Sequence, residues 1–102
     1  MILTEIVTVR KANQCATCKS YIYGMPVPVD MEFVEAMQIF GQNQYPLDKV
    51  KLIVITSQLI EIRTSLGSAE VRIKYQDNYE NTSALFREKV KQWLKVHGFS
   101  IE

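Results

Sequence analysis

The clearest alternation of apolar and polar positions lies between Val50 and Gln76, and it predicts antiparallel strands. This stretch holds the run of four aliphatic residues at 52–55, and its strongest turn signal is Leu66-Gly67 between two serines. A hairpin centred on that turn pairs apolar residues on one face and opposite charges on the other. The predicted pairs are Ile60 with Ile73, Ile62 with Val71, Glu61 with Arg72 and Arg63 with Glu70.

Two arrangements are open for the chain between residues 50 and 64. A tight turn at Ser57-Gln58 would set Ile55 against Ile60, although it lacks the Gly or Asn that primed turns prefer. The alternative is a single long bent strand. In both arrangements four further apolar side chains lie on the face opposite Ile60, where something must cover them. They are Val50, Leu52, Val54 and Leu59.

Residues 31–41 show the period of an amphipathic helix. Asp30 precedes them as an N-cap, because its carboxylate can accept hydrogen bonds from first-turn amides. Gly41 ends the helix, and Pro46 prevents it from restarting. The predicted inner face consists of Phe33, Val34, Met37 and Phe40.

Residues 82–97 form the second predicted helix, capped by Thr82 or Ser83. Gly98 followed by Phe99 is typical of a Schellman stop. The predicted inner stripe consists of Phe86, Val90, Trp93, Leu94 and His97. The outer face carries a basic line at i, i+4 spacing, formed by Arg87, Lys91 and Lys95.

The N-terminal third is the least regular part of the chain. Residues 2–10 are rich in β-branched side chains and predict a strand that is apolar on both faces. Residues 21–23 read Tyr-Ile-Tyr and could form a short strand. The two prolines in residues 25–29 hold that segment extended, because each ring fixes its own φ and restricts the residue before it.

These elements predict an α+β fold with a three- to four-stranded, mainly antiparallel sheet and two helices, in the order β-loop-α-β-β-β-α. With 102 residues, 47% hydrophobic and 23% charged, the chain is expected to form a single globular domain over residues 1–102.

The net charge of +1 provides no global basic field, so nucleic acid is not the first partner expected. No apolar run reaches the roughly 18 residues that span a bilayer. The N-terminus also lacks the basic region of a signal peptide. We therefore expect a cytoplasmic protein with no membrane partner, whose thiols stay reduced.

Cys15-Ala-Thr-Cys18 brings two sulfurs within reach of one metal ion or of each other. A structural zinc site takes four ligands, so these two would need His97 and another ligand, or a second copy of the chain. A thiol-redox site would need a long helix after the motif, which Gly24 and the following prolines prevent. The other interpretation is two ordinary thiols in a turn, with no cofactor.

The sequence favours a protein-binding or adaptor role over catalysis. No nucleophile stands at a spacing that suggests a partner for the lone His97, and the four glycines are scattered, so we expect neither an enzyme nor a small-molecule substrate. The predicted surface combines segment 15–29 with the apolar sheet edge, and it would contact another protein or form a homodimer. Its residues are Tyr21, Tyr23, Met25, Val27, Val50, Leu52, Val54 and Leu59.

The alternatives are a zinc or redox site at Cys15 and Cys18, and nucleic-acid binding through the basic line of the last helix at Arg87, Lys91 and Lys95.

Overall fold

The computed structural model describes residues 1–12 and 19–102, and within them five strands form one antiparallel sheet in the order β1-β2-β5-β4-β3. The strands are β1 Thr8–Lys11, β2 Ser20–Gly24, β3 Leu52–Thr56, β4 Ile60–Ser65 and β5 Glu70–Tyr75. The helices are α1 Leu3–Ile6, α2 Met31–Ala36, the 3₁₀ turn η1 Met37–Ile39 and α3 Tyr79–Val96. The α+β class is confirmed, with more strands than expected.

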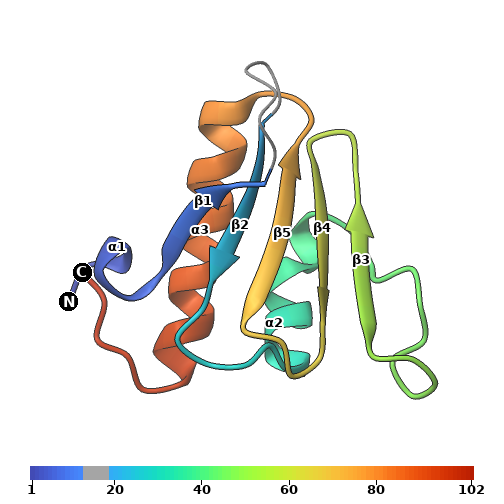
Figure 1. Ribbon diagram of the computed structural model, residues 1–102, viewed down its shortest axis with the longest axis horizontal. Coiled ribbons are helices and arrows are strands. Elements are labelled where there is room, and N and C mark those ends of the chain that lie inside the picture. The colour runs from blue at the N-terminus through green and yellow to red at the C-terminus, as the bar shows by residue number, and fades with distance from the viewer. Residues whose placement is uncertain (13–18) are drawn as a thin grey trace.

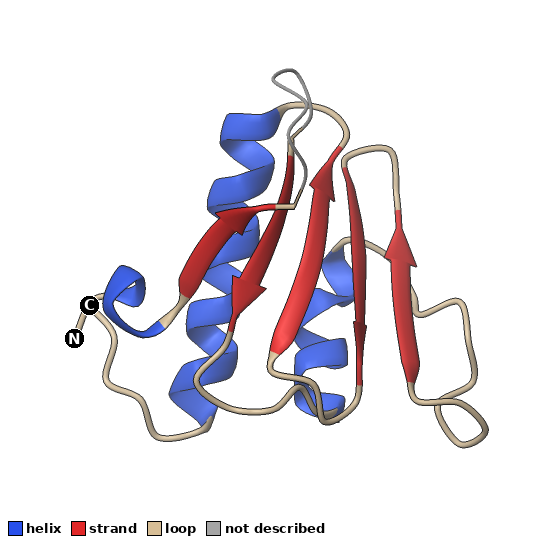
Figure 2. Ribbon diagram, viewed as in Figure 1, coloured by secondary structure: helices blue, strands red, loops and turns tan. Residues whose placement is uncertain are grey.

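The helices α2 and α3 lie on the same side of the sheet, behind it in the view of Figure 1 and Figure 2. The face turned to the viewer carries no helix from the described part of the chain. The fold is therefore a two-layer arrangement in which one sheet face is covered and the other is not. No helix within residues 1–12 and 19–102 is long and apolar enough to cross a membrane.

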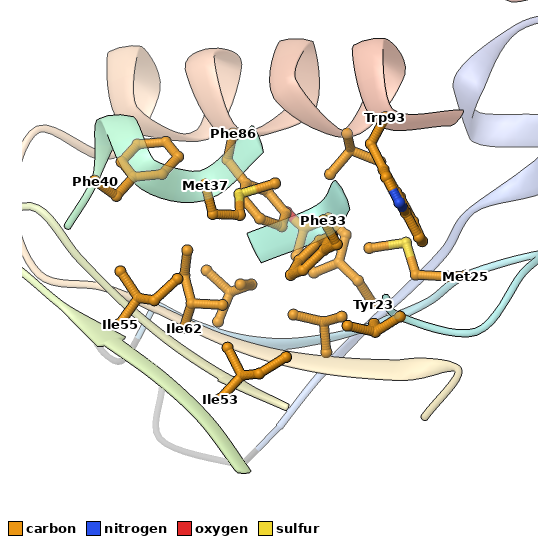
Figure 3. Packing of buried hydrophobic residues seen from close by; sticks show 14 of the residues in the cluster. Tyr23, Met25, Phe33, Met37, Phe40, Ile53, Ile55, Ile62, Phe86 and Trp93 are labelled. Carbon is orange, nitrogen blue, oxygen red and sulfur yellow. The ribbon is translucent and has the colours of Figure 1, made fainter. Parts of the chain in front are cut away.

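The core fills the space between the helices and the covered sheet face (Figure 3). Phe33 meets Trp93 edge-on with ring centroids 5.1 Å apart, which joins α2 to α3, and Tyr23 meets Phe86 in the same way at 5.0 Å. The predicted inner faces of both helices are confirmed except at His97, which is exposed. The buried positions are Phe33, Val34, Met37, Phe40, Phe86, Val90, Trp93 and Leu94.

The β4–β5 hairpin has the predicted faces but not the predicted partners. Ile62 lies opposite Ile73, and Arg63 lies opposite Arg72, each two positions along β5 from the prediction. A two-residue shift keeps every side chain on its face, so the apolar pairs persist. The predicted charge pairs are wrong: Glu61 keeps a cation opposite it, but Arg63 faces another arginine. The other observed pairs are Ile60 with Tyr75 and Glu61 with Lys74.

Two residues after the turn cause this shift. The turn forms where predicted, because the Ser68 N–H closes it with a 3.1 Å hydrogen bond around Gly67, whose φ is +88°. Ser68 and Ala69 then leave the ladder, since their carbonyls accept the N–H groups of Val29 at 2.8 Å and Met25 at 2.7 Å. A segment far away in the sequence therefore sets the register.

Residues 50–64 form two strands rather than one bent strand. Ile55 lies opposite Ile62, so the proposed Ile55–Ile60 pair is wrong by two residues. The Ser57 N–H donates to the Ile60 carbonyl at 2.9 Å, and the Ser57 hydroxyl accepts the amides of Leu59 and Ile60 at 3.2 and 3.3 Å. A serine side chain thus closes the loop in place of the missing glycine.

The predicted strand at residues 2–10 is wrong in its first half. Leu3–Ile6 is one helical turn, and the Glu5 carboxylate accepts the N–H of Ile2 at 3.4 Å. Leu3, Ile6 and Val7 follow helical i, i+3, i+4 spacing and pack on the core. The chain becomes extended only at β1. The short strand expected at residues 21–23 is confirmed as β2, which lies between β1 and β5.

The predicted caps of the last helix are wrong, because α3 begins at Tyr79. Thr82 and Ser83 are each 3% exposed, and their hydroxyls donate to the carbonyls of Asp77 at 3.1 Å and Glu80 at 3.2 Å. These two residues therefore lie inside the helix on its covered side.

The predicted helix 31–41 is α-helical only to Ala36 and continues as the 3₁₀ turn η1 to Ile39, before Gly41. The cap predictions at Asp30 and at Gly98-Phe99 are confirmed. Asp30 caps α2 by accepting the N–H of Phe33 at 3.0 Å. The Phe99 N–H reaches the Leu94 carbonyl at 3.1 Å, and Gly98 has a φ of +91°, which gives the Schellman end of α3.

Candidate functional site

The uncovered sheet face carries a row of cations that crosses the sheet. The strand registers align five residues from β3 through β4, β5 and β2 to β1, in the order Val54, Arg63, Arg72, Ile22 and Arg10. Arg63 and Arg72 stand directly opposite each other, and like charges in such a pair destabilise a sheet. The Arg63–Arg72 pair therefore brings two positive charges together in a way that does not stabilise the sheet.

Ion pairs within this face engage two of the three arginines. Arg10 Nη2 lies 2.9 Å from Glu70 Oε2, and Arg63 Nε lies 3.2 Å from Glu61 Oε2. Arg72 stands between them, is exposed, and has no ion pair within residues 1–12 and 19–102. Its guanidinium keeps its donors for water or for a partner.

A hollow of about 210 Å³ lies beside Arg72 on the same face. Its lining residues are Ala12, Ser20, Tyr21, Glu61, Arg63, Arg72, Ile73 and Lys74. Three cations and a hydroxyl thus surround this space against one carboxylate, which favours an anion. The hollow is smaller than the roughly 300–1,000 Å³ of pockets for drug-sized ligands, so it suits one carboxylate-sized group.

The structure places most of the predicted contact segment against the core. Tyr23 is 4% exposed and Met25 is 7% exposed, while Tyr21 and Val27 are half-buried. The Tyr23 hydroxyl pairs with that of Tyr75 at 2.7 Å on the covered side. Burial raises the pKa of both hydroxyls, and the hydrogen bond between them raises the pKa of Tyr75 further.

The predicted apolar edge is only partly open. Val50, Leu52 and Leu59 are 42%, 42% and 39% exposed, but Val54 is buried. The Asn43 side chain hydrogen-bonds to the outer edge of β3 there, where its Oδ1 accepts the Val54 N–H at 2.7 Å. The outer edge of β3 is therefore blocked at its centre.

In the predicted basic line of α3, Arg87 and Lys95 are exposed and Lys91 is half-buried. Lys91 lies 3.9 Å from Glu88, and Arg87 and Lys91 line a groove beside α1 at Ile2. Lys95 lies further along, beside the C-terminal residues. The three cations are thus divided between two surroundings. Cys15 and Cys18 lie outside the described residues, so the structure says nothing of a site there.

A second polar cluster joins the start of α2 to the end of α3. Asp30 Oδ1 accepts the Trp93 indole N–H at 2.9 Å, and Asp30 Oδ2 lies 2.7 Å from His97 Nε2. Burial alone would raise the pKa of Asp30, but the hydrogen bonds from Trp93 and Phe33 and the neighbouring His97 together lower it. The carboxylate is therefore ionised at neutral pH.

No family model, curated protein or solved structure matches this chain. The functional argument thus comes from the residues themselves. Sequence reasoning missed the arginine row because Arg63 was paired with Glu70 and Arg10 was assigned to no face. The available signal was the alternation of charged with apolar residues along β4 and β5, which marks an exposed face.

Proposed function

We propose that this domain is a protein-binding module that holds an acidic segment of a partner on its uncovered sheet face. The Arg63–Arg72 pair carries the proposal, because two like charges stand opposite each other and Arg72 has no ion pair among the described residues. A carboxylate accepts two parallel N–H groups from one arginine. A partner carboxylate placed between these side chains would turn a repulsive pair into a bridged one.

The side chains of this face favour a protein partner over nucleic acid. Single-stranded nucleic acids are held on aromatic platforms, and the strands place no aromatic residue on this face within the described chain. Ile22 and Val54 in the arginine row are only 5% and 3% exposed, but Leu52 beside it is 42% exposed. A segment that carries aliphatic as well as acidic side chains could contact Leu52 and the arginines together.

The proposal keeps the protein-binding role expected from the sequence and moves the surface. Tyr23 and Met25 pack in the core, so they support the fold beneath the proposed contact, whereas Val54 is buried on the uncovered face itself. Self-association through the arginine row is disfavoured, because two copies would bring like charges together. The expected occupant is therefore a different chain.

The test uses a labelled eight-residue peptide of alternating Glu and Val, measured by fluorescence anisotropy at low salt. We expect binding that weakens with salt and falls at least roughly tenfold in the Arg63→Glu/Arg72→Glu variant, because both bridging donors are reversed. The matched control is Arg87→Glu/Lys95→Glu, which makes the same charge change on α3 and should leave binding unchanged.

Three outcomes would contradict the proposal. They are no binding of the acidic peptide, equal loss in both variants, and tighter binding of single-stranded DNA than of the peptide. The last outcome would favour the nucleic-acid alternative, particularly if the α3 variant abolished it.

A second candidate is a homodimer through β1, which ends the sheet on its side. The Ala12 N–H donates to the Ser20 carbonyl, so by alternation the backbone of Val9 and Lys11 points away from β2. Val9 is also 51% exposed. Light scattering should then give a dimer that Val9→Lys converts to a monomer, and a monomeric wild type would eliminate this candidate.

A further inference from the structure

The cluster between α2 and α3 contains three potential metal ligands from two elements. One ligand atom from each of Asp30, Glu32 and His97 lies within 4.8 Å of the other two. Asp30 and Glu32 belong to the start of α2, and His97 follows the last residue of α3. Small side-chain adjustments bring such atoms to the separations found around one cation, because metal–ligand bonds are about 2.0–2.2 Å long.

The two carboxylate oxygens of Asp30 have separate partners. Oδ1 accepts both the Phe33 N–H at 3.0 Å and the Trp93 N–H at 2.9 Å, which completes the helix cap and ties it to α3. Oδ2 takes part in neither contact and faces His97 Nε2 at 2.7 Å. The cap therefore accounts for one oxygen, while the other oxygen, His97 and Glu32 are not needed for it.

The surroundings of Asp30 resemble the hydrogen-bonded support of a metal ligand. Trp93 and Phe33 fix the orientation of the carboxylate, and outer hydrogen bonds of this kind hold ligands in place in metal sites. The cluster is also open to solvent, since Glu32 lines a groove of about 440 Å³ between the two helices.

We propose that Asp30 Oδ2, the Glu32 carboxylate and His97 Nε2 form a binding site for a divalent cation of the zinc class. One imidazole nitrogen with two carboxylates suits zinc better than calcium or magnesium, which prefer oxygen ligands alone. Binding needs the lone pair of His97 Nε2, so the ring carries its proton on Nδ1 in the bound form and Asp30 Oδ2 exchanges its contact with Nε2 for the cation. Three protein ligands leave a fourth position for water. The proposal is independent of the arginine row.

The experiment is a calorimetric titration with zinc chloride in the Cys15→Ser/Cys18→Ser background, so that the two thiols cannot bind the ion. We expect one ion per chain at pH 7.5. His97→Gln keeps a hydrogen-bond donor toward Asp30 but removes the ligand, and it should weaken binding roughly tenfold or more.

Two variants of α2 separate a site from general charge attraction. Glu32→Gln removes a ligand and should weaken binding roughly tenfold, whereas Glu35→Gln makes the same charge change nearby and should leave binding unchanged. Equal effects of the two variants would overturn the proposal, as would the absence of binding in the cysteine-free background. Cobalt absorption provides a check, because loss of the His97 ligand should change the visible spectrum if the site exists and leave it unchanged if it does not.

Discussion

The two faces of the sheet are built from the same strands, and neighbouring residues on one strand meet opposite environments. Ile62 is fully buried beneath the helices, while Arg63 beside it lies on the uncovered face. One face combines apolar residues that stabilise the fold. The other places Arg63 and Arg72 opposite each other, where they repel. The contrast indicates that the first face specifies the structure, and it supports our proposal that the second face binds a partner.

The largest expected difference between the two faces comes from two adjacent substitutions on β4. Ile62→Ala should lower the free energy of unfolding by about 2–5 kcal/mol, because it opens a cavity in a close-packed core. Arg63→Ala should change it by less than about 0.5 kcal/mol. Urea denaturation measures both. Similar losses for the two variants would mean that the faces are not energetically distinct.

The next largest effect is expected at Asp30, which connects α2 to α3 on the covered side of the sheet. Asp30→Ala removes the α2 cap and the contacts from Trp93 and His97, and it should cost about 1–3 kcal/mol. Asp48→Ala, an exposed acidic residue in a loop, is the matched control and should change stability by less than about 0.5 kcal/mol.

The Asp30 contribution should also depend on pH. The folded pKa of Asp30 is lower than its unfolded value of about 3.9, so the folded state favours the ionised form. The contribution is therefore fully present above the unfolded pKa and is lost as the pH falls through the folded pKa. Urea midpoints of wild type and Asp30→Ala should converge in acid, and a constant difference down to pH 2 would contradict this account.

A smaller effect is expected at the polar pair inside the covered layer. Tyr23→Phe or Tyr75→Phe leaves one buried hydroxyl without its partner and should cost about 1–2 kcal/mol. The double variant should cost less than the sum of the two, because it removes both hydroxyls. Additive losses would show that the 2.7 Å hydrogen bond does not couple them.

The smallest effect should have the opposite sign. Arg72→Gln removes the charge facing Arg63 and should raise the free energy of unfolding by about 0.2–1 kcal/mol at low salt. The gain should shrink as salt screens the wild-type repulsion. If Arg72→Gln destabilises the domain, Arg72 serves the fold, and the argument that it is kept for a partner fails.

Local patterns predicted the layers of this fold, and distant contacts decided the rest. Ile60 and Ile62 share one sheet face because they are two positions apart, and Phe33 and Met37 share one helix face because they are four apart. These are properties of short segments, and each was predicted correctly. The strand partners were not, because Ser68 and Ala69 leave the ladder to bind segment 25–29. No feature within the hairpin itself contains that information.

The candidate site likewise depends partly on local sequence patterns and partly on contacts between distant segments. Arg63 and Arg72 could be assigned to the charged face of the hairpin from the sequence, but their alignment with Arg10 depends on the registers of β1 and β5 with β2 and β4. The cluster of Asp30 with His97 likewise joins residues that are 67 positions apart in the chain. Both sites are products of tertiary structure.

The most direct test of the central claim is a nuclear magnetic resonance titration of the labelled domain with the alternating Glu-Val peptide. The account predicts that the largest amide shifts fall at Arg63, Arg72 and Ile22 on the uncovered face, with little change in α3. Shifts concentrated in α3, or no shifts at peptide excess, would contradict the claim that the uncovered face is the binding surface.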